Sequence, residues 1–244
     1  MSSARRLLVA GSAAALLLAG CGGDASDRTA AAASSAAAAS SARASEAPDL
    51  VSGLLPAAAF GPDATVLALP PEQLRAGAGI VAGGPDARIT PESCRAAVDG
   101  TQPALDAFED VAAQSATTGS ATTVQLLVRG GPIEGAAAQL AEAAEQCPEA
   151  RLVAPQVGEA TVTFEELPLA DLGDGSALLR YTTAVAAPDG SQVTVPALIA
   201  AVEDGDRLLL LLILDTGFGG APPDPAAFAE LVEQAYQVQA DALG

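Results

Sequence analysis

The stretch from Asp204 to Gly217, DGDRLLLLLILDTG, decides the fold because seven consecutive apolar residues, 208–214, lie at its centre. Seven residues are too few to cross a bilayer as a helix. The Asp-Gly dipeptide before them is a strong signal for a tight hairpin turn, so the run predicts a strand. Because its residues do not alternate between apolar and polar, this strand should be central. Both of its faces should be buried, one by a helix and the other by a helix or loop.

The segments on the N-terminal side of this run predict further strands of the same sheet. Short turns separate them at 117–120, at Pro188-Asp189-Gly190 and at Asp204-Gly205, which predicts antiparallel neighbours. Pro196 has no backbone N–H to donate, so the strand around it should have a bulge or a partly free side. The strands expected are 108–116, 121–129, 157–167, 177–186, 192–202 and 207–214, with a further short strand at 65–69.

Helices are expected before and after these strands. Thr90-Pro91-Glu92 has the composition of a helix start, with the Thr90 hydroxyl as N-cap and proline at the first helical position. Pro148 should end another helix, and Asp224-Pro225 should begin the last one. The apolar faces of these two helices are Ile133, Ala137, Leu140, Ala144 and Cys147, and Phe228, Leu231, Val232, Ala235 and Val238. Residues 49–244 are therefore predicted to form one α+β domain, a twisted antiparallel sheet of about six strands with helices packed on it.

The composition of the 244 residues excludes several classes of function. The chain has no His and no Lys, and its formal net charge is −19. Without His, Ser-His-Asp and Cys-His catalysis are excluded, and the commonest neutral metal ligand is missing. A strongly acidic surface repels phosphate backbones, so a nucleic-acid partner is not expected. No cofactor is expected either.

The N-terminus has the parts of a bacterial lipoprotein signal peptide, which we assign to residues 1–20. Arg5 and Arg6 supply positive charge, and the apolar stretch Leu7–Ala19 is too short for a comfortable transmembrane helix. Leu18-Ala19-Gly20-Cys21 resembles the lipobox, in which small residues precede the cysteine that is acylated. Two or three acyl chains on Cys21 would hold the protein at the extracytoplasmic face of the cell membrane. The alternative is an ordinary secretory signal with a chance cysteine.

Residues 21–48 are predicted to be this lipidated cysteine and a tether. After Cys21 the segment consists mostly of Ala and Ser and contains no large apolar side chain, so it has nothing with which to build a core. If the segment is flexible, its root-mean-square span is roughly 30 Å. The predicted organisation is therefore a signal peptide (1–20), a lipidated cysteine and tether (21–48) and one folded domain (49–244).

The two remaining cysteines, Cys94 and Cys147, form a pair if Cys21 is acylated. In an oxidising compartment such a pair is expected to form a structural disulfide. The alternatives are two buried free thiols or a redox pair, although a redox pair usually has the closer C-x-x-C spacing. Because both residues fall on the inner faces of predicted helices, a disulfide between them would pin those helices together.

One sequence pattern resembles a catalytic motif and is interpreted as structural. Asp215-Thr216-Gly217 after an apolar run resembles the aspartic-protease motif, but that chemistry needs two carboxylates that share a proton. The near matches Asp174-Gly175-Ser176 and Asp189-Gly190-Ser191 have the wrong order and are interpreted as turns. A homodimeric protease needs only one motif, but the final helix takes up most of the region where its flap and supporting strand would lie. The pattern therefore predicts a strand end followed by an Asp-x-Gly turn.

Other acidic and glycine-rich patterns are also interpreted without a catalytic or metal-binding role. The carboxylate pairs Glu109-Asp110, Glu165-Glu166 and Glu203-Asp204 are expected to be solvated surface, because Ca²⁺ needs about six to eight oxygen ligands from a defined loop. Gly83-Gly84 and Gly219-Gly220 are not followed by Lys and so do not form a phosphate-binding loop. We therefore predict no catalytic residue and no metal ligand.

The order of these elements resembles that of a known family. The resemblance rests on the Thr-Pro-Glu-Ser-Cys helix start at 90–94, on VAAQSATTGSATTVQLLVRGG at 111–131, on the helix ending in Cys147-Pro148, and on PDGSQVTVPALIAAVEDGDRLLLLLI at 188–213. Over about residues 50–243 this pattern is similar to the PknH-type extracellular sensor domain and to related actinobacterial, mycobacterial-type lipoproteins. The chain departs from the namesake in having one cysteine pair rather than two and no Trp near Cys147.

The resemblance implies an antiparallel sheet with helices, a disulfide, and a cleft that binds an unidentified extracytoplasmic ligand. We therefore expect a lipid-anchored lipoprotein whose sensor-like domain binds a small or lipidic ligand and is not an enzyme. The alternative is a non-catalytic structural or adaptor lipoprotein that binds cell-envelope proteins. No ligand-binding residue is assigned from the sequence.

Overall fold

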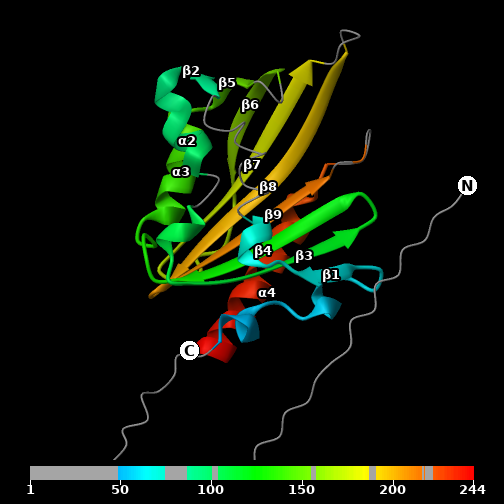
Figure 1. Ribbon diagram of the computed structural model, residues 1–244, viewed down its shortest axis with the longest axis vertical. Helices are drawn as coiled ribbons and strands as arrows, with labels where there is room; N and C mark the ends of the chain where they lie inside the picture. Colours follow the sequence, from blue (N-terminus) through cyan, green and yellow to red (C-terminus); the bar gives the residue numbers. More distant parts are fainter. Residues whose placement is uncertain are drawn as a thin grey trace, which may run out of the picture. The chain divides into compact units, whose positions relative to one another are not determined.

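One antiparallel sheet organises the domain. The computed structural model describes residues 49–74, 87–100, 104–154, 158–186, 191–215, 217 and 222–244, all of which belong to the unit Ser45–Gly244. Within them, nine strands pair in the order β1-β3-β4-β9-β8-β7-β6-β5-β2 (Figure 1). The α+β class is confirmed, with more strands than the six predicted. The strands are β1 (Thr65–Ala68), β2 (Arg88–Thr90), β3 (Asp110–Thr118), β4 (Ala121–Arg129), β5 (Glu149–Ala154), β6 (Gly158–Leu167), β7 (Gly175–Ala186), β8 (Gln192–Asp204) and β9 (Arg207–Asp215).

Strands β2 and β5, which the sequence interpretation missed, form one edge of the sheet. Strand β2 has three residues, too few to show a period of two. Strand β5 does alternate, with Ala150, Leu152 and Ala154 buried, and it begins directly after Pro148 ends the preceding helix. Its register with β6, Leu152 opposite Ala160, places this apolar set on the buried face.

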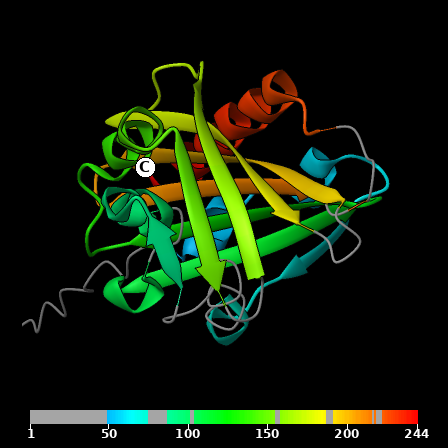
Figure 2. The same ribbon diagram turned by 90° about the horizontal axis from the view of Figure 1, so that it is seen from above.

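Strand β9 is central, as its apolar run predicted. It lies between β4 and β8, and Leu208, Leu209 and Leu211 are each at most 3% exposed. Leu209 and Leu211 pack in a core with helix α4 (Pro225–Leu243), whereas Leu208 packs in a core with helix α3 (Ala136–Gln146). We call these two sides of the sheet the α4 face and the α3 face. In Figure 2, helix α4 (red) lies against one side of the sheet.

Pro196 lies where β8 loses one of its neighbours. The β8–β9 pairing runs from Asp204 opposite Arg207 to Ala197 opposite Leu214, and it ends before Pro196. On the other side, Pro196 remains opposite Thr182 of β7. The predicted partly free side of this strand is therefore confirmed.

The α3 face is covered by helices joined through the cysteine pair. Helix α3 buries Ala137, Leu140 and Ala143, and it packs against strands β6, β7 and β8. A 3₁₀ turn, η3 (Glu92–Cys94), leads into the short helix α2 (Arg95–Gly100), which packs on α3. The prediction that the Thr90 hydroxyl caps this helix is wrong. Thr90 belongs to β2, opposite Arg151, and Pro91 occupies the N-cap position without a side-chain hydrogen bond.

Helix α4 begins as its sequence predicted. The Asp224 carboxylate accepts a hydrogen bond of 2.9 Å from the backbone N–H of Ala226, and Pro225 is the first helical residue. At the other end, the Arg207 guanidinium donates to the Leu243 carbonyl and pairs with Asp204, so a cation lies at the negative end of the helix dipole. The residues that α4 buries are Phe228, Val232, Ala235, Gln239 and Leu243. None of the described helices is long and apolar enough to span a membrane.

Candidate functional site

A cavity of about 280 Å³ lies on the α4 face, at the end of the sheet where β9 stops and α4 begins. Its walls come from segments that are distant in sequence: the 3₁₀ turn η2 (Ala57–Phe60), the β3–β4 hairpin, the end of β9 and the first two turns of α4. Most of the lining is apolar. The apolar residues are Ala59, Phe60, Ala116, Ala121, Ile213, Ala227, Phe228 and Leu231, and the polar ones are Thr118, Thr123 and Asp224.

The strand register builds the floor of this cavity from small side chains. Ala116 lies opposite Thr123, and Thr123 lies opposite Ile213, so these three side chains form one row across β3, β4 and β9. Thr118 and Ala121 form the next row, at the hairpin. Because side chains on alternate residues of a strand share a face, both rows point toward α4. Short side chains along two adjacent rows leave space beneath the helix.

The roof of the cavity is the N-terminal part of α4. Phe228 is only 3% exposed and anchors the helix in the core, whereas Leu231 is half-buried and Ala227 is exposed. The small Ala227 side chain therefore leaves the cavity open on the solvent side of the helix.

The part of the cavity formed by Ala59 and Phe60 is held in place by a buried glutamine pair, which we call the glutamine clamp. Gln114 and Gln125 lie opposite each other on β3 and β4, and the Gln114 Nε2 donates to the Gln125 Oε1 at 2.8 Å. The same two side chains bind the backbone of Leu55: its N–H donates to Gln125 Oε1 at 2.9 Å, and its carbonyl accepts from Gln114 Nε2 at 2.8 Å. The clamp thus fixes the chain between η1 (Leu50–Gly53) and η2, and so places Ala59 and Phe60 beside the sheet.

Asp215 marks the end of β9 on the same face as the cavity. It lies opposite Ala121, in the hairpin row, and its Oδ1 accepts a hydrogen bond of 2.7 Å from the backbone N–H of Gly217. This is the turn predicted from the sequence. A hydrogen bond from the Ser120 side chain, followed by the Gly217 bond, lowers the pKa of Asp215 below its ordinary value, so the carboxylate is ionised at neutral pH.

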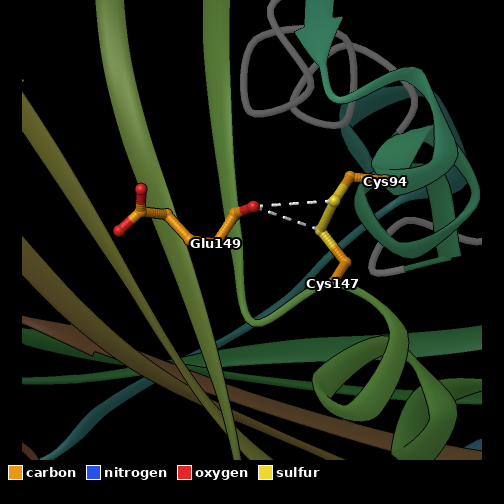
Figure 3. The surroundings of a disulfide bond; sticks show 3 residues. All are labelled: Cys94, Cys147 and Glu149. Carbon is orange, nitrogen blue, oxygen red and sulfur yellow. Dashed lines mark hydrogen bonds between the residues drawn. A yellow bond between two sulfur atoms is a disulfide. The ribbon is translucent and has the colours of Figure 1, made fainter.

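The cysteine pair forms the predicted disulfide. Cys94 and Cys147 are bonded, with their Cα atoms 5.2 Å apart, and both are at most 1% exposed. The bond joins η3 to the end of α3, as Figure 3 shows. The Glu149 carbonyl oxygen lies 3.6 and 3.7 Å from the two sulfurs, so the start of β5 contacts the disulfide. The pair belongs to the core on the α3 face, whereas the cavity lies on the α4 face.

At least one member of each carboxylate pair has a partner in the fold. Asp110 binds Arg129 and Glu165 binds Arg180; in both pairs the two residues lie on neighbouring strands and the carboxylate is the exposed partner. The expectation that Glu203 is solvated is wrong. It is 8% exposed, and its carboxylate accepts from the backbone N–H groups of Gly135 at 3.0 Å and Ala137 at 2.7 Å.

Glu203 therefore supplies from β8 the cap that α3 lacks in its own sequence, since Gly135 is the N-cap residue and has no side chain. No group of three or more His, Cys, Asp or Glu within the described residues is placed to hold a metal ion. Cys21, the signal peptide, the tether and the turn at 188–190 lie outside the described residues, as do Gly83-Gly84 and Gly219-Gly220.

The α3 face carries a second apolar region that α3 does not bury completely. Leu210, Leu212 and Val185 are half-buried there, together with Tyr181. Burial raises the pKa of the Tyr181 phenol, which therefore stays neutral at physiological pH. The region offers apolar surface on the α3 face, whereas the cavity described above lies on the α4 face.

Comparisons with known proteins give structural neighbours only. No family model matches the chain, and no curated protein sequence matches it. An X-ray structure of an uncharacterized protein from Mycobacterium smegmatis, an Rv0999 ortholog, is 10% identical with a TM-score of 0.44; the match covers 78% of this chain and 96% of that one. The extracellular domain of PknH from Mycobacterium tuberculosis is 9% identical with a TM-score of 0.37, over 72% of this chain and 97% of that one. The domain that the sequence resembles is therefore among the structural neighbours of this chain.

Proposed function

We propose that the chain is a lipid-anchored extracytoplasmic protein whose folded domain binds a small, mainly apolar ligand in the cavity on the α4 face. The cavity carries the proposal. It is about 280 Å³ in volume, close to the lower end of ligand pockets at roughly 300 Å³, and it is lined mainly by apolar side chains with a few polar groups at defined positions. The lipobox-like sequence at Cys21, the Ala/Ser-rich tether and the buried disulfide support the extracytoplasmic location.

Packing energetics supports a binding role for this hollow. Protein interiors are normally close-packed, and burying more apolar surface stabilises a fold by about 25 cal/mol per Å². Larger side chains at Ala116, Ala121 or Ala227 would occupy part of the space. In their absence, a ligand whose apolar part enters the cavity can bury its own apolar surface there and gain the corresponding free energy.

The binding proposal is tested by native mass spectrometry of the protein extracted from membranes in mild detergent. We expect a bound species on the wild-type chain and its loss in Ala227→Trp, because the indole would fill the cavity from its open side. Ala242→Trp is the matched control, since Ala242 is exposed at the far end of the same helix. A ligand-free wild type, or equal retention by both variants, would contradict the proposal.

The lipid anchor is tested separately. We expect the wild type in the membrane fraction and Cys21→Ala in the soluble fraction, because the substitution removes the thiol that accepts the acyl group. A Cys21→Ala protein that stays with the membrane would show that something else anchors it.

One observation favours the second candidate, an adaptor that binds an envelope protein. Leu67 is 62% exposed on β1, an edge strand whose other side has no neighbour among the described strands. Apolar side chains on an open edge are a common route to pairing with another chain. A photo-reactive residue at position 67 that cross-links to one defined protein, while the same residue at Val153 on β5 does not, would favour the adaptor.

A further inference from the structure

Among the described residues, the charged groups at the cavity are carboxylates. Asp224 lines it, and Asp215 lies in the neighbouring hairpin row on the same face of the sheet. Both carboxylates are already hydrogen-bonded to backbone N–H groups, which hold them in place at the two element ends that meet here. No arginine is among the residues that line the cavity.

The nearest described cations are distant or already paired. Arg129 and Arg207 lie opposite each other at the far end of the β4–β9 ladder, eight residues from Ala121 and Asp215, or about 26 Å at 3.3 Å per residue. Arg180 is closer. Its register through Leu198 to Ile213 places it two strands away, about 10 Å, on the same face. Its guanidinium binds Glu165, which offsets its charge.

The dipole of α4 does not reverse this sign. The N-terminus of a long helix carries a partial charge of about +0.5, and α4 directs that end at the cavity. Asp224 caps it, and Asp215 adds a second carboxylate. Together the two carboxylates and the helix end amount to about −1.5 charges, so the potential at the mouth is negative.

We infer that the cavity selects small amphiphiles that carry a protonated amine beside their apolar part and discriminates against amphiphiles that carry a carboxylate or phosphate. The inference rests on the proposed function, since it names the class of ligand for the same cavity. The apolar part would contact Ile213, Phe228 and Leu231. The ammonium would lie at the rim, where Asp224 attracts it and the hydroxyl of the exposed Thr118 can accept one of its hydrogen bonds.

The inference is tested with three probes that share one tail and differ in charge: octylammonium, 1-octanol and octanoate. Their dissociation constants for the full-length protein are measured by calorimetry at low ionic strength. We expect octylammonium to bind about tenfold more tightly than octanoate, with octanol between them, because each partly exposed charge contact contributes a factor of roughly 1.5 to 5. At about 1 M salt, where the Debye length is about 3 Å, this ratio should fall to about two.

Two conservative variants test whether Asp224 and Asp215 cause the preference for octylammonium over octanoate. Asp224→Asn and Asp215→Asn each keep a side-chain oxygen for the backbone N–H, so the cap and the turn remain. Each should lower the octylammonium-to-octanoate ratio by about two- to fourfold. Asp241→Asn is the control for net charge, because Asp241 is exposed near the far end of α4, and it should leave the ratio unchanged.

The outcomes separate this inference from the proposal on which it rests. Equal binding of all three probes, abolished by Ala227→Trp, would overturn the charge selection and leave the cavity as a ligand site. Tighter binding of octanoate, or the same loss of selectivity in Asp241→Asn as in Asp224→Asn, would also overturn the selection. If no probe binds the wild type, the proposed function fails for this class of ligand and the inference fails with it.

Discussion

The glutamine clamp gives a prediction in which two similar substitutions have unequal effects. Gln114→Leu removes the donor to the Leu55 carbonyl and one of the two donors to Gln125 Oε1. Gln125→Leu removes the acceptor for the Leu55 N–H and one of the two acceptors of Gln114 Nε2. Leu55 is only 2% exposed, so in either variant one of its backbone groups is left buried without that partner.

The difference arises from the Gln125 amide nitrogen. Gln125 is 0% exposed, and its Nε2 is buried without a hydrogen-bond partner. A buried unsatisfied donor costs about 1–3 kcal/mol, and a typical hydrogen bond contributes about 1 kcal/mol. Gln114→Leu should therefore lower the free energy of unfolding by about 2–4 kcal/mol. Gln125→Leu also removes the unsatisfied Nε2, which offsets most of the loss, so we expect a net decrease of only about 1 kcal/mol.

The measurement is urea unfolding followed by circular dichroism, with the disulfide intact in all proteins. Amide hydrogen exchange at Leu55 supplies a local readout, because its N–H loses its acceptor in Gln125→Leu and keeps it in Gln114→Leu. We expect the variant with the larger stability loss to keep the more protected Leu55 amide, relative to its own global stability. Equal stability losses, or a larger loss in Gln125→Leu, would refute the reasoning. That result would mean that Gln125 Nε2 has a partner, such as a buried water.

Two further predictions concern covalent and ionic contributions to stability. Replacing both Cys94 and Cys147 by Ser opens a loop with a sequence separation of 53 residues and should lower the free energy of unfolding by about 4 kcal/mol in the chain-entropy model; an unchanged urea midpoint after reduction would contradict this. Because the folded pKa of Asp215 is below its ordinary value of 3.8, its contribution to stability should be present above about pH 4 and lost as the pH falls through the folded pKa. Asp215→Asn should therefore flatten the acid limb of the stability curve, and an equally steep limb in variant and wild type would show that Asp215 contributes nothing there.

The central part of the fold could be predicted because its sequence patterns are long. The unbroken apolar run 208–214 indicated a central strand, although Leu210 and Leu212 on the α3 face are only half-buried. The period of helix α4 was visible from Phe228 through Val232 and Ala235. The edge of the sheet could not be predicted in the same way. Strand β2 is too short to have a period, and the alternation of β5 follows directly on a helix end, where a loop is the usual outcome.

The roles of individual polar residues depended on contacts across the sheet. Glu203 follows an apolar strand and precedes Asp204-Gly205, which is the usual setting of an exposed turn residue. It is buried because α3 begins at Gly135, a residue without a capping side chain, directly over the end of β8. Nothing within a few residues of either position signals this pairing, since 68 residues separate them. The glutamine clamp is hidden for the same reason, because Gln125 and Leu55 are 70 residues apart.

The cavity depends on where two elements end, and the sequence contained that information in a misleading form. The Asp-Thr-Gly pattern resembles a catalytic motif, but in the fold Asp215 is the residue at which β9 stops and Gly217 closes the turn. The next helix starts at Asp224, so the chain returns to the same end of the sheet with a second carboxylate. The β3–β4 hairpin reaches as far as β9 there, with Ala121 opposite Asp215, and small side chains leave the space beneath α4 open. The strand end, the helix start and the hairpin together therefore form an apolar cavity with two fixed carboxylates near its mouth. The negative potential of these carboxylates is the property by which the cavity can recognise a ligand.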